Sequence, residues 1–192
     1  GTNIETVTSD PSNPVNGQVW YNSTDQVLKG FTSNPAGGWS TSGNLNTARK
    51  SLEGTGASNS AAIAFGGTAN PPIYALTEIY NGSAWTEVAD LNVGRTSMGA
   101  AGTSTAALGF GGYNGTARVA SNETWNGSSW TETGDLNTAR SDLAAAVAGT
   151  STSTQGTGGY STTYVAINES WNGSSWTEVG DLNSARYSMA GS

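Results

Sequence analysis

The chain has 192 residues, a formal net charge of −7, and neither cysteine nor histidine. This composition excludes disulfides, thiol chemistry, Cys/His zinc sites and histidine-based catalytic triads. We therefore expect no cofactor and no metal. The acidic balance, with Lys29 and Lys50 as the only lysines, disfavours nucleic acid as a partner. The apolar runs are too short to insert into a membrane, and the start of the sequence does not resemble a signal peptide.

The sequence predicts an all-β protein. Charged residues make up only 11% of the chain, and no stretch shows the 3.6-residue apolar spacing of a long helix. Short alternating runs bounded by Gly and Asn are typical of strands and turns.

The N-terminal residues are expected to form two elements. Pro11 and Pro14 predict an extended, non-helical lead-in over residues 1–16. Residues 17–44 match the second half of a unit that repeats further along, with a third strand at 19–22 and a fourth at 38–41.

A Leu-Asn-x-x-Arg motif then occurs four times, starting at Leu45, Leu91, Leu136 and Leu182. The copies start 46, 45 and 46 residues apart. They divide the chain into repeats at 45–90, 91–135 and 136–181, and the segment 182–192 supplies only the start of another repeat. A fixed period of this size indicates a repeat architecture in which no unit can bury its apolar face alone.

The repeat 91–135 serves as the template. Strands are expected at 96–101, 106–110, 123–125 and 129–133, with a Gly-Gly pair after the second strand. Asn126-Gly127 suits a two-residue type I′ hairpin between the third and fourth strands. In the third repeat the second strand is expected at 154–157, where the sequence is less apolar than in the other copies.

This unit, with its Arg, its Gly-Gly pair and two aromatic residues five positions apart, resembles the kelch repeat, whose units fold as blades of a β-propeller. The resemblance covers residues 45–192 and implies three complete four-stranded blades. A composite blade from both termini would then close a ring of about four blades. Two alternatives are a longer array and a homo-oligomer in which two chains share a larger ring.

A second resemblance concerns the run from Asp10 to Phe31, which contains Asp-Pro-Ser-Asn-Pro and Val-Trp-Tyr-Asn. It is similar to a segment that recurs in tail-fibre and other virion proteins of bacteriophages. This resemblance implies a virion or extracellular location and contact with other virion proteins or with a host-surface glycan or protein.

Residues at the same register in each copy are interpreted as structural. The arginines are expected to pair with a nearby carboxylate or carbonyl, although a ring of them could instead bind an anion or a sugar carboxylate. The tryptophans are expected to pack between blades rather than stack on sugars. These structural residues are Arg49, Arg95, Arg140, Arg186, Trp85, Trp130 and Trp176.

The connections between the second and third strands differ most between the copies. Loops on a rigid scaffold are where binding residues usually lie, and Tyr and Arg suit both sugar and protein surfaces. The alternative is unconstrained drift in exposed turns. The candidate ligand-binding residues are Tyr74, Tyr113, Arg118, Tyr160 and Tyr164.

These observations favour a non-enzymatic binding or structural module of a phage particle. An intracellular kelch-type protein-interaction propeller is the alternative. A sialidase-like or oxidase-like propeller enzyme is less well supported, because the sequence lacks the His and Cys copper ligands and the Asp-box turns that such enzymes use.

Overall fold

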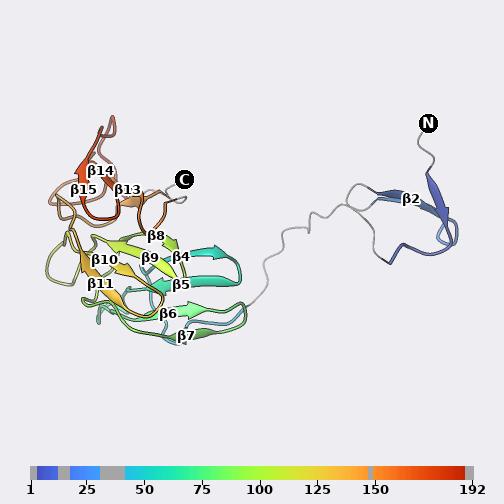
Figure 1. Cartoon of the computed structure of the whole chain (residues 1–192), viewed down its shortest axis with the longest axis horizontal. Coiled ribbons are helices and arrows are strands. Elements are labelled where there is room, and N and C mark those ends of the chain that lie inside the picture. Colours follow the sequence, from blue (N-terminus) through green and yellow to red (C-terminus); the bar gives the residue numbers. More distant parts are fainter. Residues whose placement is uncertain (1–3, 13–17, 31–41, 147–148, 189–192) are drawn as a thin grey trace. The chain divides into compact units, whose positions relative to one another are not determined.

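The computed structural model describes residues 4–12, 18–30, 42–146 and 149–188. These residues form strands, bridges and turns without any helix, which confirms the all-β prediction. Nothing helical in these ranges could cross a lipid bilayer. The chain divides into an N-terminal unit, residues 1–41, and a larger unit, residues 42–192 (Figure 1).

The N-terminal unit is a three-stranded sheet in the order β1-β2-β3, with β1 Glu5–Val7, β2 Val19–Asn22 and β3 Val27–Gly30. Strand β2 pairs in parallel with β1 and antiparallel with β3. Asp10 ties the sheet together, because its carboxylate accepts hydrogen bonds from Trp20 Nε1 (3.1 Å), Asn22 Nδ2 (2.8 Å) and Lys29 Nζ (2.8 Å). These bonds, that of Lys29 first, lower the pKa of Asp10 to about 2.

This sheet differs from the half blade expected over 17–44. Residues 19–22 do form a strand, but both of its edges are filled by N-terminal strands. The lead-in expected over 1–16 contributes one of them, β1. The proposed fourth strand at 38–41 lies outside the described residues, so the composite closing blade stays a prediction.

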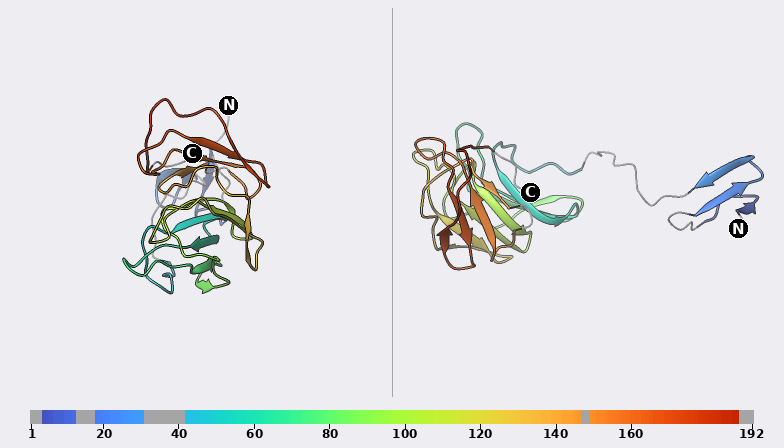
Figure 2. Two further views of the ribbon diagram at one scale, coloured as in Figure 1. Left: turned by 90° about the vertical axis from the view of Figure 1, so that its left-hand side faces the viewer. Right: turned by 90° about the horizontal axis from the view of Figure 1, so that it is seen from above.

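The larger unit contains three four-stranded antiparallel sheets, one within each repeat range (Figures 1 and 2). In each sheet the strands lie side by side in chain order. We call them the first, second and third repeat sheets. The first is β4 Glu53–Ser58, β5 Ala61–Phe65, β6 Thr77–Tyr80 and β7 Trp85–Glu87; the second is β8 Gly99–Thr103, β9 Ala106–Phe110, β10 Asn122–Trp125 and β11 Trp130–Thr133; the third is β12 Ala144–Ala145, β13 Thr154–Thr157, β14 Asn168–Trp171 and β15 Trp176–Glu178.

The expected two-residue hairpin after each third strand is wrong. Trp125 pairs directly with Trp130, which leaves a four-residue loop. The Asn126 side chain accepts the backbone N–H groups of Ser128 and Ser129, both at 2.9 Å. An Asn side chain competes in this way with regular backbone pairing. Only Gly127 takes a positive φ, of 96°, whereas a type I′ turn needs two such residues.

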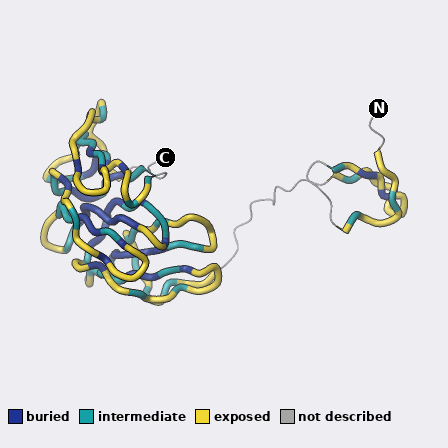
Figure 3. Tube along the Cα trace, viewed as in Figure 1, coloured by how far each residue is buried: buried dark blue, intermediate teal, exposed yellow. Residues whose placement is uncertain are grey.

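Large apolar side chains fill the space between neighbouring repeat sheets. Phe65 packs edge-on against Trp130 of the second sheet, with ring centroids 4.8 Å apart. Phe110 packs on Trp176 of the third sheet at 4.7 Å, with the two rings tilted by 51°. Both phenylalanines are fully buried. Buried stretches, dark blue in Figure 3, alternate with exposed loops in the larger unit. Burial of such a side chain contributes about 1.5–3 kcal/mol, so these contacts stabilise the stacking of the sheets.

The first strands of the repeat sheets lie next to one another, with β8 in contact with both β4 and β12. Thr55 Oγ1 donates to Gly102 O at 2.5 Å, which joins β4 to β8. A second series of bonds runs through the residues with positive φ that lie two positions after each motif arginine. The backbone N–H of each residue donates to the backbone oxygen of the equivalent residue one repeat earlier: Ser97 to Ser51 (3.0 Å), Asp142 to Ser97 (2.9 Å) and Ser188 to Asp142 (2.8 Å).

The polar second strand of the third repeat lies where it was expected, as β13. Its register aligns Thr157 with Phe65 and Phe110, because all three lie opposite the first residue of the following strand. The third sheet therefore carries a threonine where the first two carry the phenylalanine that fills the next interface. Residues 182–188, which follow it, contain no strand, and 189–192 lie outside the described residues.

Candidate functional site

The Leu-Asn-x-x-Arg motif binds one buried glutamate in each repeat sheet. In the second sheet, Glu123 of β10 accepts the Asn92 backbone N–H at 2.8 Å and Arg95 Nη2 at 2.7 Å. The Arg95 guanidinium also donates to the carbonyls of Gly111 and Ser121. The equivalent ion pairs in the other two sheets are Arg49–Glu78 and Arg140–Glu169.

The paired arginines and glutamates are all shielded from solvent, with side-chain exposures of 0% to 1%. Burial lowers the pKa of Arg95 from its usual value, and the charge of Glu123 opposes this effect. These groups therefore hold the start of each repeat against its own third strand. They present no surface to an external anion, in agreement with the structural interpretation of the motif.

Arg186 differs from the other three arginines of the motif. It is exposed, and its Nε donates to the backbone oxygen of Ser184 at 3.3 Å. The three tryptophans expected to be structural also differ. Trp130 and Trp176 are buried between repeat sheets, whereas Trp85 is only partly buried and packs on Tyr80 at 5.2 Å.

Four of the five candidate ligand-binding residues lie together on the surface. Arg118 of the second repeat places its guanidinium carbon 4.1 Å from the Tyr160 ring centroid and 5.8 Å from that of Tyr113. Tyr160 meets Tyr164 edge-on at 5.5 Å. Tyr164 in turn stacks on Tyr187 at 4.6 Å, with an angle of 1° between the rings. We call these five residues the tyrosine–arginine stripe.

The backbone explains how the stripe forms. Tyr113 and Arg118 face each other across one narrow loop, and Tyr160 and Tyr164 face each other across the equivalent loop of the next repeat. The loops of neighbouring sheets lie side by side, so Arg118 reaches Tyr160. Tyr187 directly follows the Arg of the last motif, a register occupied in earlier copies by Lys50, Thr96 and Ser141.

Two tyrosines of the stripe are strongly exposed: Tyr164 at 53% and Tyr187 at 47%. The pKa of Tyr164 is raised, chiefly by a side-chain hydrogen bond with Tyr187. The result is a pair of parallel aromatic rings beside a cation. Such a surface can stack on a ligand and hydrogen-bond to it.

The candidate residues from the sequence and the residues of the stripe differ at two positions. Tyr74 is not part of the stripe; its backbone N–H pairs with Gly67 O, the register that Val119 and Val165 hold in the next two repeats. Tyr187 was missed, because the segment 182–192 was interpreted only as the beginning of a blade. The signal was present, since only this copy of the motif is followed by an aromatic residue.

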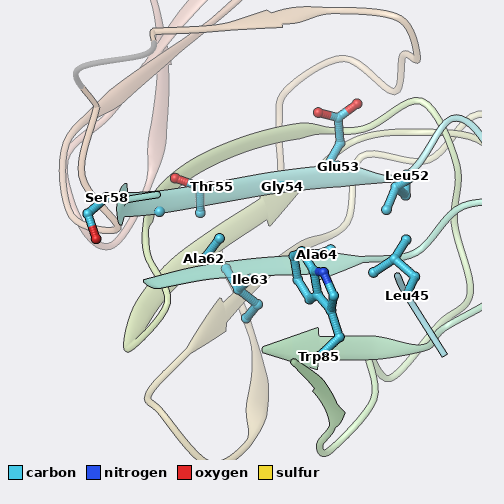
Figure 4. A pocket seen from close by; sticks show the side chains of 11 residues that line it. Leu45, Leu52, Glu53, Gly54, Thr55, Ser58, Ala62, Ile63, Ala64 and Trp85 are labelled. Carbon is cyan, nitrogen blue, oxygen red and sulfur yellow. The ribbon is translucent and has the colours of Figure 1, made fainter. Parts of the chain in front are cut away.

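A separate apolar groove of about 480 Å³ lies on the face of the first repeat sheet that neither of the other two repeat sheets covers. Trp85, Leu45 and Leu52 line it together with Ala62 and Ala64 of β5 (Figure 4). The equivalent residues Trp130, Leu91 and Met98 form the interface between the first and second sheets. The groove is therefore an unfilled copy of the contact that joins the other repeats.

Acidic residues outside the buried ion pairs do not form a metal site: the described ranges contain no group of three or more His, Cys, Asp or Glu side chains placed to share an ion.

Glu53, at the rim of the groove, has its pKa raised to about 7, first by burial and then by the charge of Asp142.

No family model matches the chain, and no curated protein is detectably similar to it. The assignment of function therefore depends on the geometry of the stripe and of the sheets that carry it.

Proposed function

We propose that the protein is a non-enzymatic binding module, and that the tyrosine–arginine stripe is its ligand-binding surface. The observation that carries this proposal is the stripe itself. Loops of two repeats and the last motif bring four tyrosines and one arginine into a continuous series of ring contacts. An exposed, connected group of aromatic rings on a rigid scaffold is a favoured arrangement for recognition.

The scaffold that we propose is a kelch-like β-propeller. Three sheets with the same strand order, inner strands in contact and the same aromatic residue between neighbours support it. The groove beside Trp85 is then the face that a further blade would cover. That blade comes from both termini, from a longer array or from a second chain.

The partner that we propose is a glycan or protein at a host-cell surface, met by a phage particle. The residues that carry the resemblance to virion segments include Asp10, Trp20, Asn22 and Lys29, and these are the residues that tie the N-terminal sheet together. The division of the chain into two units fits a module whose N-terminal part contacts other virion proteins while the repeats bind the host.

The experiment is a binding assay on arrays of bacterial surface glycans and on intact bacterial cells. We expect the Tyr164→Ala/Tyr187→Ala variant to lose binding at least tenfold, because it removes the most exposed rings of the stripe. Tyr21→Ala is the matched control, since it also removes an exposed tyrosine but lies in the N-terminal unit. Equal binding by the double variant and the control would remove the stripe as the binding surface.

A further inference from the structure

We propose that the ligand of the stripe is an acidic glycan, in which a sugar carboxylate binds Arg118 while a sugar ring stacks on the tyrosines. This inference rests on the proposed function and specifies the ligand class. It begins with the contrast between Arg118 and the buried arginines. Arg49, Arg95 and Arg140 each bind a glutamate. Arg118 is exposed, and no Asp or Glu in the described ranges forms an ion pair with it.

The tyrosines hold Arg118 without using its hydrogen-bonding capacity. The flat face of a guanidinium is attracted to an aromatic ring, whereas the N–H donors of the guanidinium lie at its edge. The 4.1 Å contact with Tyr160 therefore restrains the side chain and leaves its donors available. The planar fork of a guanidinium matches a carboxylate, which accepts two parallel hydrogen bonds from it.

The rest of the stripe suits the ring of the same sugar. Tyr164 and Tyr187 lie parallel and half exposed, and Tyr160 connects them to the arginine. A tyrosine ring offers an apolar face for the C–H groups of a sugar, and its hydroxyl can bond to sugar hydroxyls. A ligand that engages both parts must carry its carboxylate next to a pyranose face, as uronic and ulosonic acids do.

The charge of the whole molecule narrows the class further. A net charge of −7 repels a dense polyanion. Among the described residues, Arg118 is the one cationic side chain in contact with the tyrosine rings of the stripe. The favoured ligand therefore carries spaced carboxylates among neutral sugars. Its affinity should fall as salt rises, although weakly, because only one ion pair forms.

The test uses array glycans in matched pairs: oligosaccharides that contain glucuronic, galacturonic or sialic acid, and the same compounds after reduction of the carboxyl to a primary alcohol. We expect the bound members to be acidic and to lose at least tenfold in affinity on reduction. Arg118→Ala should lose a similar factor. Arg118→Lys should keep part of the affinity, because it keeps the charge but not the two-pronged donor. Tyr21→Ala is again the control.

The outcomes separate the two proposals. If a bound glycan keeps its affinity after carboxyl reduction, or if Arg118→Ala binds as well as the wild type, the acidic-glycan inference is overturned while the stripe stays the binding surface. If the Tyr164→Ala/Tyr187→Ala variant binds glycans and cells as the wild type does, the proposed function fails, and the inference fails with it.

Discussion

The packing between repeat sheets leads to a sharp prediction at Gly156. A Cβ added there would lie 2.9 Å from the Phe110 ring, 3.3 Å from Leu143 and 3.4 Å from Trp176. The first distance is too short for carbon atoms in contact, so Gly156→Ala must displace the buried phenylalanine. Overpacking of this kind costs about 1–3 kcal/mol.

A smaller effect acts in the opposite direction. Replacing glycine with alanine reduces the entropy of the unfolded chain, which stabilises the folded state by about 0.4–1 kcal/mol where the backbone permits it. We therefore expect Gly156→Ala to lower the free energy of unfolding by about 1.3 kcal/mol, which is the difference between the middle values of these two effects, about 2 and about 0.7 kcal/mol. Gly180→Ala is the control, because a Cβ at Gly180 meets nothing within 4 Å. It should be neutral or slightly stabilising.

The assay is urea unfolding followed by far-ultraviolet circular dichroism, with a double-mutant cycle. Phe110→Leu shortens the side chain that Gly156 accommodates, so the penalty of Gly156→Ala should shrink by about 1 kcal/mol in that background. The reasoning is refuted if Gly156→Ala and Gly180→Ala have the same stability, or if the penalty is unchanged by Phe110→Leu.

Three further predictions concern charged groups. Glu123→Ala should lower the free energy of unfolding, measured by chemical denaturation, by about 3–5 kcal/mol, because it leaves Arg95 buried without its partner. Glu132→Ala, at an exposed position of the neighbouring strand, should change this free energy little. Equal losses in the two variants would contradict the role of the ion pair. Burial raises the pKa of Glu53 from 4.5 to about 7, so its contribution to stability is complete below pH 4.5 and is lost as the pH rises through 7. Thermal unfolding across this range should show the decline, and Glu53→Gln should flatten it. The lowered pKa of Asp10 has the opposite sign: its contribution is present above pH 3.8 and is lost as the pH falls through about 2. Asp10→Asn should weaken the N-terminal sheet at neutral pH, which the Trp20 indole signal in an NMR spectrum would report; an unchanged signal would contradict this.

The strands of the repeats could be predicted because their apolar residues alternate and the same pattern recurs. The turn after each third strand could not, because the choice depends on whether the Asn side chain or the backbone accepts the N–H groups of the loop. The partner of the repeated arginine was equally hidden. Glu78, Glu123 and Glu169 lie 29, 28 and 29 residues after their arginines, and only the fold identifies these glutamates as the partners.

The N-terminal segment shows a different limit. Its Trp and Asn resemble those of the repeat hairpin, but sequence likeness does not decide which strand pairs with which. Here β2 pairs with β1 and β3, and Asp10 supplies the bonds that fix this arrangement. A single carboxylate ten or more residues away in the chain was not a feature that the repeat pattern could reveal.

The surface that we propose for binding could be predicted in part, for a physical reason. The buried phenylalanines and the backbone hydrogen bonds between successive repeats fix the spacing between the sheets, so side chains at one register of successive loops become neighbours. Where that register is exposed, a substitution changes the surface without disturbing the packing. At one such register the repeats carry Ile73, Arg118 and Tyr164. At the register that follows the motif arginine they carry Lys50, Thr96, Ser141 and finally Tyr187, of which Thr96 and Ser141 are buried and Lys50 and Tyr187 are exposed. A stripe assembled from one or two changes in each repeat is therefore the arrangement by which this scaffold could acquire a binding site while its core stays constant.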